Sequence, residues 1–191
     1  MAELGPGAGS DDPGSGDGRA VLVCSPAGGG GPWDACADLL SPGEDDPVDL
    51  LYVCFSGDPA ARLDALRERG VSLDRTAVAS IGADVEGADP DRTYTVGDIE
   101  AVEELSDLGM YVRDAVFDWA DRDGPTAVCF DSVTEMLERA DLELTFEFLL
   151  VLIEGIRPSG AVAHFHFDPE AHDGQTRRTL EHLFDETIEH A

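Results

Sequence analysis

Short apolar runs alternate with longer amphipathic stretches from residue 20 to the carboxyl terminus. Five of these runs have the length of a buried strand and lie between turn-forming or polar residues: 20–25, 49–55, 76–81, 126–131 and 161–167. Strands that alternate with helical segments are typical of βαβ units. The pattern therefore predicts an α/β fold built on a mostly parallel sheet.

The segments between these runs predict helices. Asp58 is placed to cap a helix that has Pro59 at its first position, turns Leu63 and Leu66 inward and ends at Gly70. Further helices are predicted at 33–40, 96–122, 142–156 and 174–189.

Three of these stretches have particular features. Gly109 is a candidate break within 96–122, whose apolar residues otherwise recur every three or four positions. Residues 142–156 are apolar nearly all round, which predicts a buried helix, and the polar stretch 84–95 predicts irregular structure.

The amino-terminal segment has a different composition. Residues 1–18 are mostly Gly, Pro, Ser, Ala and Asp, with almost no apolar side chain whose burial would offset the entropy of ordering. We predict a disordered acidic tail over 1–18, followed by a single domain over 19–191 that is long enough to bury a substantial core.

The chain is strongly acidic, and arginine is its only cationic residue type. It has 41 Asp and Glu against 12 Lys and Arg, a formal net charge of −29, and no lysine. Molar salt screens the repulsion among these charges, because the Debye length falls to about 3 Å at 1 M. The composition is typical of a halophilic archaeon. Because such a surface repels DNA, RNA and anionic lipids, we expect no nucleic-acid and no membrane partner.

The cysteines and the absence of apolar spans bear on localisation. Cys24, Cys54 and Cys129 lie in apolar strand-like runs, Cys36 lies in a short helical stretch, and no Cys-x-x-Cys pair occurs. We interpret them as reduced thiols that fill the core, in preference to disulfides or zinc ligands. No apolar run reaches membrane-spanning length and no secretory signal is evident, so we predict a cytoplasmic protein.

A glycine-rich loop follows the first predicted strand, as in proteins that wrap phosphates with backbone N–H groups. Against the pattern G-x-x-x-x-G-K-S/T, Ser25 replaces the first glycine and Gly30 matches the second, with Gly28 and Gly29 before it. Gly31 then stands at the lysine and Pro32 at the magnesium-binding hydroxyl. The chain therefore lacks the groups that a P-loop ATPase uses on its β and γ phosphates and on Mg²⁺.

Two further segments carry a resemblance to a known family. The run 127–132 (AVCFDS) occupies the place of a Walker B strand, and the segment 165–173 (FHFDPEAHD) closes the pattern. With the order of elements, they resemble the RecA/KaiC-like proteins of haloarchaea, some of which are labelled transducer-like, over residues 20–188.

The resemblance implies a three-layer fold with helices on both faces of the sheet, the strand order 5-1-4-3-2 and a regulatory role. It aligns Asp131, followed by Ser132, with the Walker B aspartate, although capping or hydrogen bonding of the next turn is the favoured role for both. The carboxylates that polarise water in active relatives are absent after the second strand, where Asp58 is the nearest substitute.

Histidines near the carboxyl terminus suggest a second kind of site. His164 and His166 are two residues apart on a predicted strand and so share a face, with Asp168 and His172 nearby. A metal site of His164, His166 and His172 is one interpretation, and structural histidines with no metal are the favoured one. If the fifth strand lies beside the first, His166 and Asp168 lie at the ligand-binding edge of the sheet near the glycine loop.

Two functions are compatible with these patterns. The first is a non-enzymatic regulatory or interaction protein, in a process such as signalling, that binds protein partners and no cofactor; homo-oligomer formation stays open. The alternative is an ATPase-like switch that holds ATP with Mg²⁺ through the backbone of Gly28 to Gly31. A triad hydrolase is disfavoured because no G-x-S-x-G elbow is present.

Overall fold

The computed structural model describes residues 18–26, 31–41, 47–82, 93–96, 102–120 and 124–190. The strands are β1 (Arg19–Cys24), β2 (Val48–Cys54), β3 (Leu73–Ile81), β4 (Thr93–Val96), β5 (Thr126–Asp131), β6 (Val162–Phe167) and β7 (Glu186–Glu189). The helices are α1 (Gly31–Leu40), α2 (Pro59–Glu68), α3 (Val102–Ala120), α4 (Val133–Arg139), α5 (Leu142–Ile156) and α6 (Gly174–Glu181), with a 3-10 turn, η1 (Arg157–Ser159). The predicted tail lies outside the described residues, apart from Gly18.

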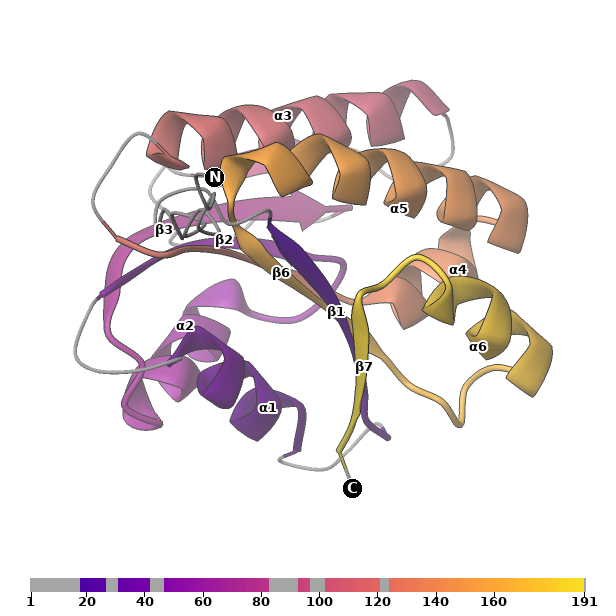
Figure 1. Ribbon diagram of the computed structural model, residues 1–191, viewed down its shortest axis with the longest axis horizontal. Helices are drawn as coiled ribbons and strands as arrows, with labels where there is room; N and C mark the ends of the chain where they lie inside the picture. The colour runs from indigo at the N-terminus through magenta and orange to yellow at the C-terminus, as the bar shows by residue number, and fades with distance from the viewer. Residues whose placement is uncertain are drawn as a thin grey trace, which may run out of the picture.

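The strands form one parallel sheet in the order β4-β3-β2-β5-β6-β1-β7. Helices α3 and α5 cover one face and α1 and α2 the other (Figure 1). The side chains of each strand alternate between the two faces, so that Leu51 and Val53 pack under α3 and α5 whereas Leu50 and Tyr52 pack against α1 and α2. The predicted three-layer, parallel α/β class is confirmed.

The predicted strand order is wrong. Numbered as predicted, the five strands lie in the order 3-2-4-5-1 instead of 5-1-4-3-2, with β4 and β7 added at the two edges. The central strands are all apolar and buried, so their composition carries no information on which of them are neighbours. The order implied by the resemblance numbers five strands along the chain, whereas the described residues also form β4 and β7.

One missed strand lies within the predicted carboxyl-terminal helix, 174–189. Helix α6 ends at Glu181, and β7 pairs with β1. Before the strand begins, the Asp185 N–H donates to the Ala20 carbonyl at 2.9 Å and the Asp185 carboxylate accepts from the Ala20 N–H at 2.8 Å. The pairing with β7 provides hydrogen-bond partners for the backbone groups along the outer side of β1, an interaction with a distant segment that helical periodicity does not record.

The other helix predictions hold with altered limits. Helix α2 has the expected Asp58 cap, Pro59 start and buried Leu63 and Leu66. Helix α3 begins at Val102 and runs unbroken through Gly109. Helix α4 was missed, and Thr93–Val96 forms β4 at the end of the stretch predicted to be irregular.

Helix α5 is a helix as predicted but is not buried all round. Leu149, Leu152, Ile153 and Ile156 are in the core, whereas Val151 is 71% exposed. None of the described helices combines the length and the apolar character that crossing a membrane requires.

Candidate functional sites

A cleft of about 530 Å³ lies at the carboxyl ends of the central strands. Five residues predicted for a site line it: Ser25, Asp131, Ser132, His166 and Asp168. They meet because β1 pairs with β6, which places Cys24 opposite Phe167. The prediction that His166 and Asp168 lie at the ligand-binding edge required the fifth predicted strand, β6, to lie beside β1, and the two strands are paired. Gly28, Gly29 and Gly30 lie outside the described residues, and Gly31 is the first residue of α1.

Asp131, which lines this cleft, has two close partners. It accepts a hydrogen bond from the Tyr52 hydroxyl at 2.5 Å and lies 3.7 Å from an Arg62 guanidinium nitrogen. Burial and then the Asp131 carboxylate raise the pKa of Tyr52 well above its usual range, so the phenol stays protonated and donates. The Arg62 guanidinium also lies 4.4 Å from the centre of the Trp33 ring, in a cation–π contact.

The neighbouring polar groups have structural partners. The Ser132 hydroxyl accepts from the Glu135 N–H at 3.2 Å and caps α4, and Asp58 accepts from the Ala60 N–H at 2.9 Å and caps α2. The Asp168 carboxylate accepts from the Glu170 N–H at 2.8 Å. These contacts are the helix caps and turn bonds that short polar side chains form.

The cleft has an excess of negative charge. Among the described residues that line it, Arg62 is the one arginine, whereas Asp131, Glu135, Glu138 and Asp168 are acidic. The arginine was not identified from the sequence, because nothing on α2 indicates which of its residues reaches across to β5. The acidic side chains among these described residues therefore outnumber the arginine.

A second cluster lies under α1, against the middle of the sheet. It consists of Cys36 from α1, Cys129 from β5, and His164 and His166 from β6. One ligand atom from each residue lies within 4.8 Å of the other three, and Cys36 Sγ is 2.9 Å from His166 Nε2. All four residues are buried.

The histidines of this cluster have polar atoms without hydrogen-bond partners. Both ring nitrogens of His164 and Nδ1 of His166 are buried and unpaired, and each such group costs about 1–3 kcal/mol. Burial, followed by the proximity of His166, lowers the pKa of His164 well below its usual range, so that ring is neutral. Burial has the opposite effect on an acidic group and raises the pKa of the Cys129 thiol.

The predicted grouping of His164, His166 and His172 is only partly present. His172 stacks on Phe167, with ring centroids 5.6 Å apart, and is not one of the four clustered residues. The sequence does not indicate that Cys36 and Cys129 lie beside the histidines, because they are far away along the chain and meet them only through strand pairing and helix packing. All four cysteines are buried, as predicted, and none of them forms a disulfide.

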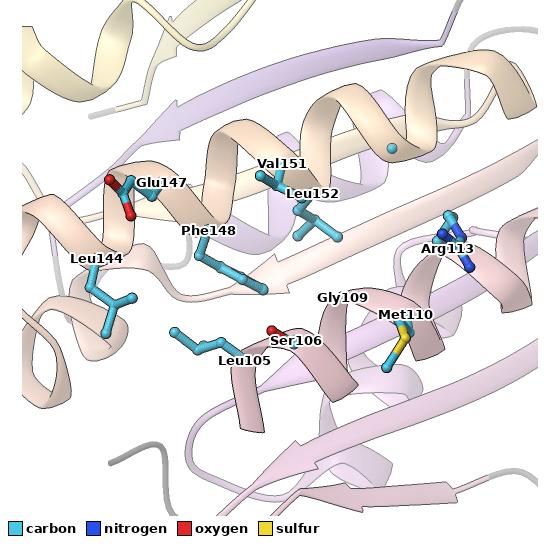
Figure 2. A pocket seen from close by; sticks show the side chains of 11 residues that line it. Leu105, Ser106, Gly109, Met110, Arg113, Leu144, Glu147, Phe148, Val151 and Leu152 are labelled. Atoms are coloured by element: carbon cyan, nitrogen blue, oxygen red, sulfur yellow. The ribbon is translucent and has the colours of Figure 1, made fainter. Parts of the chain in front are cut away.

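An apolar groove of about 360 Å³ lies between α3 and α5. Figure 2 shows Leu105 from α3 and Leu144, Phe148 and Leu152 from α5 around it. Gly109 and Gly155 leave room in its walls, since a Cβ on Gly155 would meet no atom within 4 Å. Its lining includes the exposed apolar side chains Met110 (49% exposed) and Val151 and the charged side chains Arg113 and Glu147.

Comparison with known proteins gives a family and a fold. The family described as "Family of unknown function (DUF7504)" matches residues 18–190. A solved structure of an uncharacterized protein from Pyrococcus horikoshii, in complex with an unknown peptide, is similar with a TM-score of 0.63 and 15% identity. The similarity covers 91% of this chain and 77% of that one. No curated protein matches the chain.

Proposed function

The chain belongs to the DUF7504 family of unknown function, and we propose that it is a catalytically inactive RecA/KaiC-like domain that acts by binding a protein partner. A cytoplasmic setting at high salt is part of this proposal. The net charge of −29 and the four free cysteines support it.

The chemistry of the carboxyl-edge cleft is the observation that carries the inactive part of the proposal. A phosphoryl-transfer site needs cations on the phosphates and an acidic group free to hold Mg²⁺. Here Arg62 is paired with Asp131 and stacked on Trp33, and Asp131 also accepts from Tyr52. Three more acidic side chains lie in the wall, so the described side chains of the cleft carry a net negative charge, which opposes nucleotide binding.

The topology supports the RecA/KaiC-like assignment. The sheet is parallel and has helices on both faces (Figure 1), as the resemblance implies, although its strand order differs from 5-1-4-3-2. In this arrangement β6 lies between β1, which leads toward the glycine-rich loop, and β5, which ends at Asp131.

The groove between α3 and α5 is the proposed contact surface. Its apolar floor accepts aliphatic side chains. Glu147 and Arg113 in its wall offset each other, whereas the chain as a whole carries a net charge of −29, which favours a basic partner. We therefore propose that the partner contributes an amphipathic segment with aliphatic anchors flanked by arginine or lysine. The complex of the Pyrococcus horikoshii protein supports a peptide ligand, since that protein has a similar fold.

Nucleotide binding tests the inactive part of this proposal. ATP with Mg²⁺ is titrated into the full chain in molar KCl while the melting temperature and phosphate release are followed. Binding at a hundredfold excess over the dissociation constant would stabilise the fold by about 2.7 kcal/mol. We expect neither a shift nor phosphate. A shift without phosphate would support the nucleotide-binding switch instead, and turnover would refute inactivity.

A peptide-display selection tests the groove. The library contains amphipathic segments with aliphatic anchors and either arginine or glutamate flanks, and the selection is made in molar KCl. We expect the wild type to enrich arginine-flanked peptides and Gly155→Leu, which fills the groove, to lose them. Ala61→Leu adds the same side chain to an exposed position of α2 on the opposite face and should retain them. Equal enrichment by Gly155→Leu, or no enrichment at all, would contradict the proposed contact surface.

A further inference from the structure

We propose that Cys36, Cys129, His164 and His166 form a structural zinc site that joins α1 to the centre of the sheet. Two cysteine sulfurs and two imidazole nitrogens are a ligand set typical of tetrahedral structural zinc. With Zn–S of about 2.3 Å and Zn–N of about 2.0–2.1 Å, tetrahedral ligand atoms lie about 3.3–3.8 Å apart. The four ligand atoms lie within 4.8 Å of one another, so adjustments of about 1 Å bring them to this geometry.

The backbone holds these side chains at one point. Cys129 and His164 are register partners on the adjacent strands β5 and β6. His166 lies two residues further along β6 and therefore on the same face. Helix α1 packs on that face and brings Cys36 to within 2.9 Å of His166 Nε2. Three of the four ligands thus come from paired strands at the centre of the sheet.

The unpaired nitrogens are the independent observation that points to a ligand. His164 is fully buried and His166 is 5% exposed. Neither nitrogen of His164 has a hydrogen-bond partner among the described residues. A metal ion binds the lone pair of a neutral imidazole nitrogen, so it would satisfy a buried histidine nitrogen that has no hydrogen-bond partner in the protein.

Charge balance also suits a buried site. Each Zn–S bond that forms replaces an S–H bond, and the two protons are released to solvent. Zn²⁺ with two thiolates and two neutral imidazoles has no net charge, so the assembled site needs no further counter-ion in the core. His166 lines the carboxyl-edge cleft, which provides a route for the ion.

Four protein ligands complete a tetrahedral shell and leave no position for substrate, so the site is structural. It would tie α1, the helix that follows the glycine-rich loop, to β5 and β6. This inference depends neither on the groove nor on the absence of nucleotide binding.

Metal content and cobalt substitution test the site. The full chain is purified through a tag that contains no histidine, and its zinc is measured by mass spectrometry. It is then loaded with Co²⁺ in place of zinc. We expect about one zinc per chain, and in the cobalt form the visible bands of a tetrahedral ion with thiolate-to-cobalt charge-transfer absorption. Wild-type protein that binds no zinc, or that gives no charge-transfer absorption with cobalt, would overturn the proposal whatever the variants do.

Matched variants separate this site from the acidic surface, which also attracts cations. Cys129→Ser and His164→Gln should each weaken zinc binding at least about tenfold, since the loss of even an outer-shell partner costs that much. Cys54→Ser and His172→Gln change a buried cysteine and a histidine outside the cluster and should bind as the wild type does. Unchanged charge-transfer absorption in Cys36→Ser combined with Cys129→Ser would also refute the assignment. Circular dichroism identifies any variant that does not fold.

Discussion

Replacing Gly155 with alanine should stabilise the protein. Gly155 lies within α5, and its backbone is outside the left-handed region. An added Cβ would meet no atom within 4 Å, so the substitution causes no clash. A glycine in a helix interior is about 0.8–1.0 kcal/mol less favourable than alanine. Because Gly155 lies in the last turn of α5, we expect the free energy of unfolding to rise by at most about that amount.

Gly57→Ala is the matched control, because it makes the same chemical change in a different backbone conformation. Gly57 has φ of +86°, where an L-residue costs roughly 1–2 kcal/mol. Both variants are unfolded with urea in molar KCl and compared with the wild type at constant m-value. In thermal unfolding, each kcal/mol should shift the midpoint by about 2–4 °C in a chain of this size, upward for Gly155→Ala and downward for Gly57→Ala.

A loss of stability in Gly155→Ala would refute the reasoning. It would mean that the groove at Gly155 is closed or filled in solution, for example by a second copy of the chain. Stabilisation that depends on protein concentration would lead to the same conclusion, because a monomeric helix effect does not vary with concentration.

Three further predictions concern packing, capping and pH. Phe148→Ala should cost about 3–5 kcal/mol of unfolding free energy because its ring is packed in the core. Val151→Ala, at an exposed position of the same helix, should change the unfolding free energy by less than about 0.5 kcal/mol. Equal effects of the two substitutions in urea unfolding would contradict the assignment of Phe148 to the buried face of α5 and Val151 to the exposed face. Asp58→Ala should cost about 1 kcal/mol by removing the cap of α2, and an unchanged thermal midpoint would argue against the cap. Hydrogen bonds from the Ala20 N–H and then from Arg157 lower the pKa of the Asp185 carboxyl in the folded chain. Asp185 therefore stabilises the fold above its unfolded pKa of about 3.9, and this stabilisation is lost as the pH falls from that value through the folded pKa. The stability difference between wild type and Asp185→Asn should therefore narrow in acid, and a constant difference from neutral to acid pH would contradict this.

Much of the candidate cleft could be predicted from the sequence. In a parallel sheet the residues that follow the strands meet at one edge, so His166 and Asp168 could be placed near the loop that begins at Ser25, given that the fifth predicted strand lies beside the first. Asp131 was aligned with the Walker B aspartate through the family resemblance. The cation at that site could not be predicted, because Arg62 reaches Asp131 from a helix whose rotation about its own axis depends on packing.

The sequence by itself determined the class of the fold, five of its strands, the Asp58 cap and the absence of a P-loop lysine, because these follow from local patterns and from composition. The tertiary structure alone decided the order of the strands, the conversion of 186–189 into β7 and the meeting of Cys36 and Cys129 with His164 and His166. These features depend on which backbone groups need partners and on which distant segments pack together. Hydrophobic periodicity along the chain does not record either.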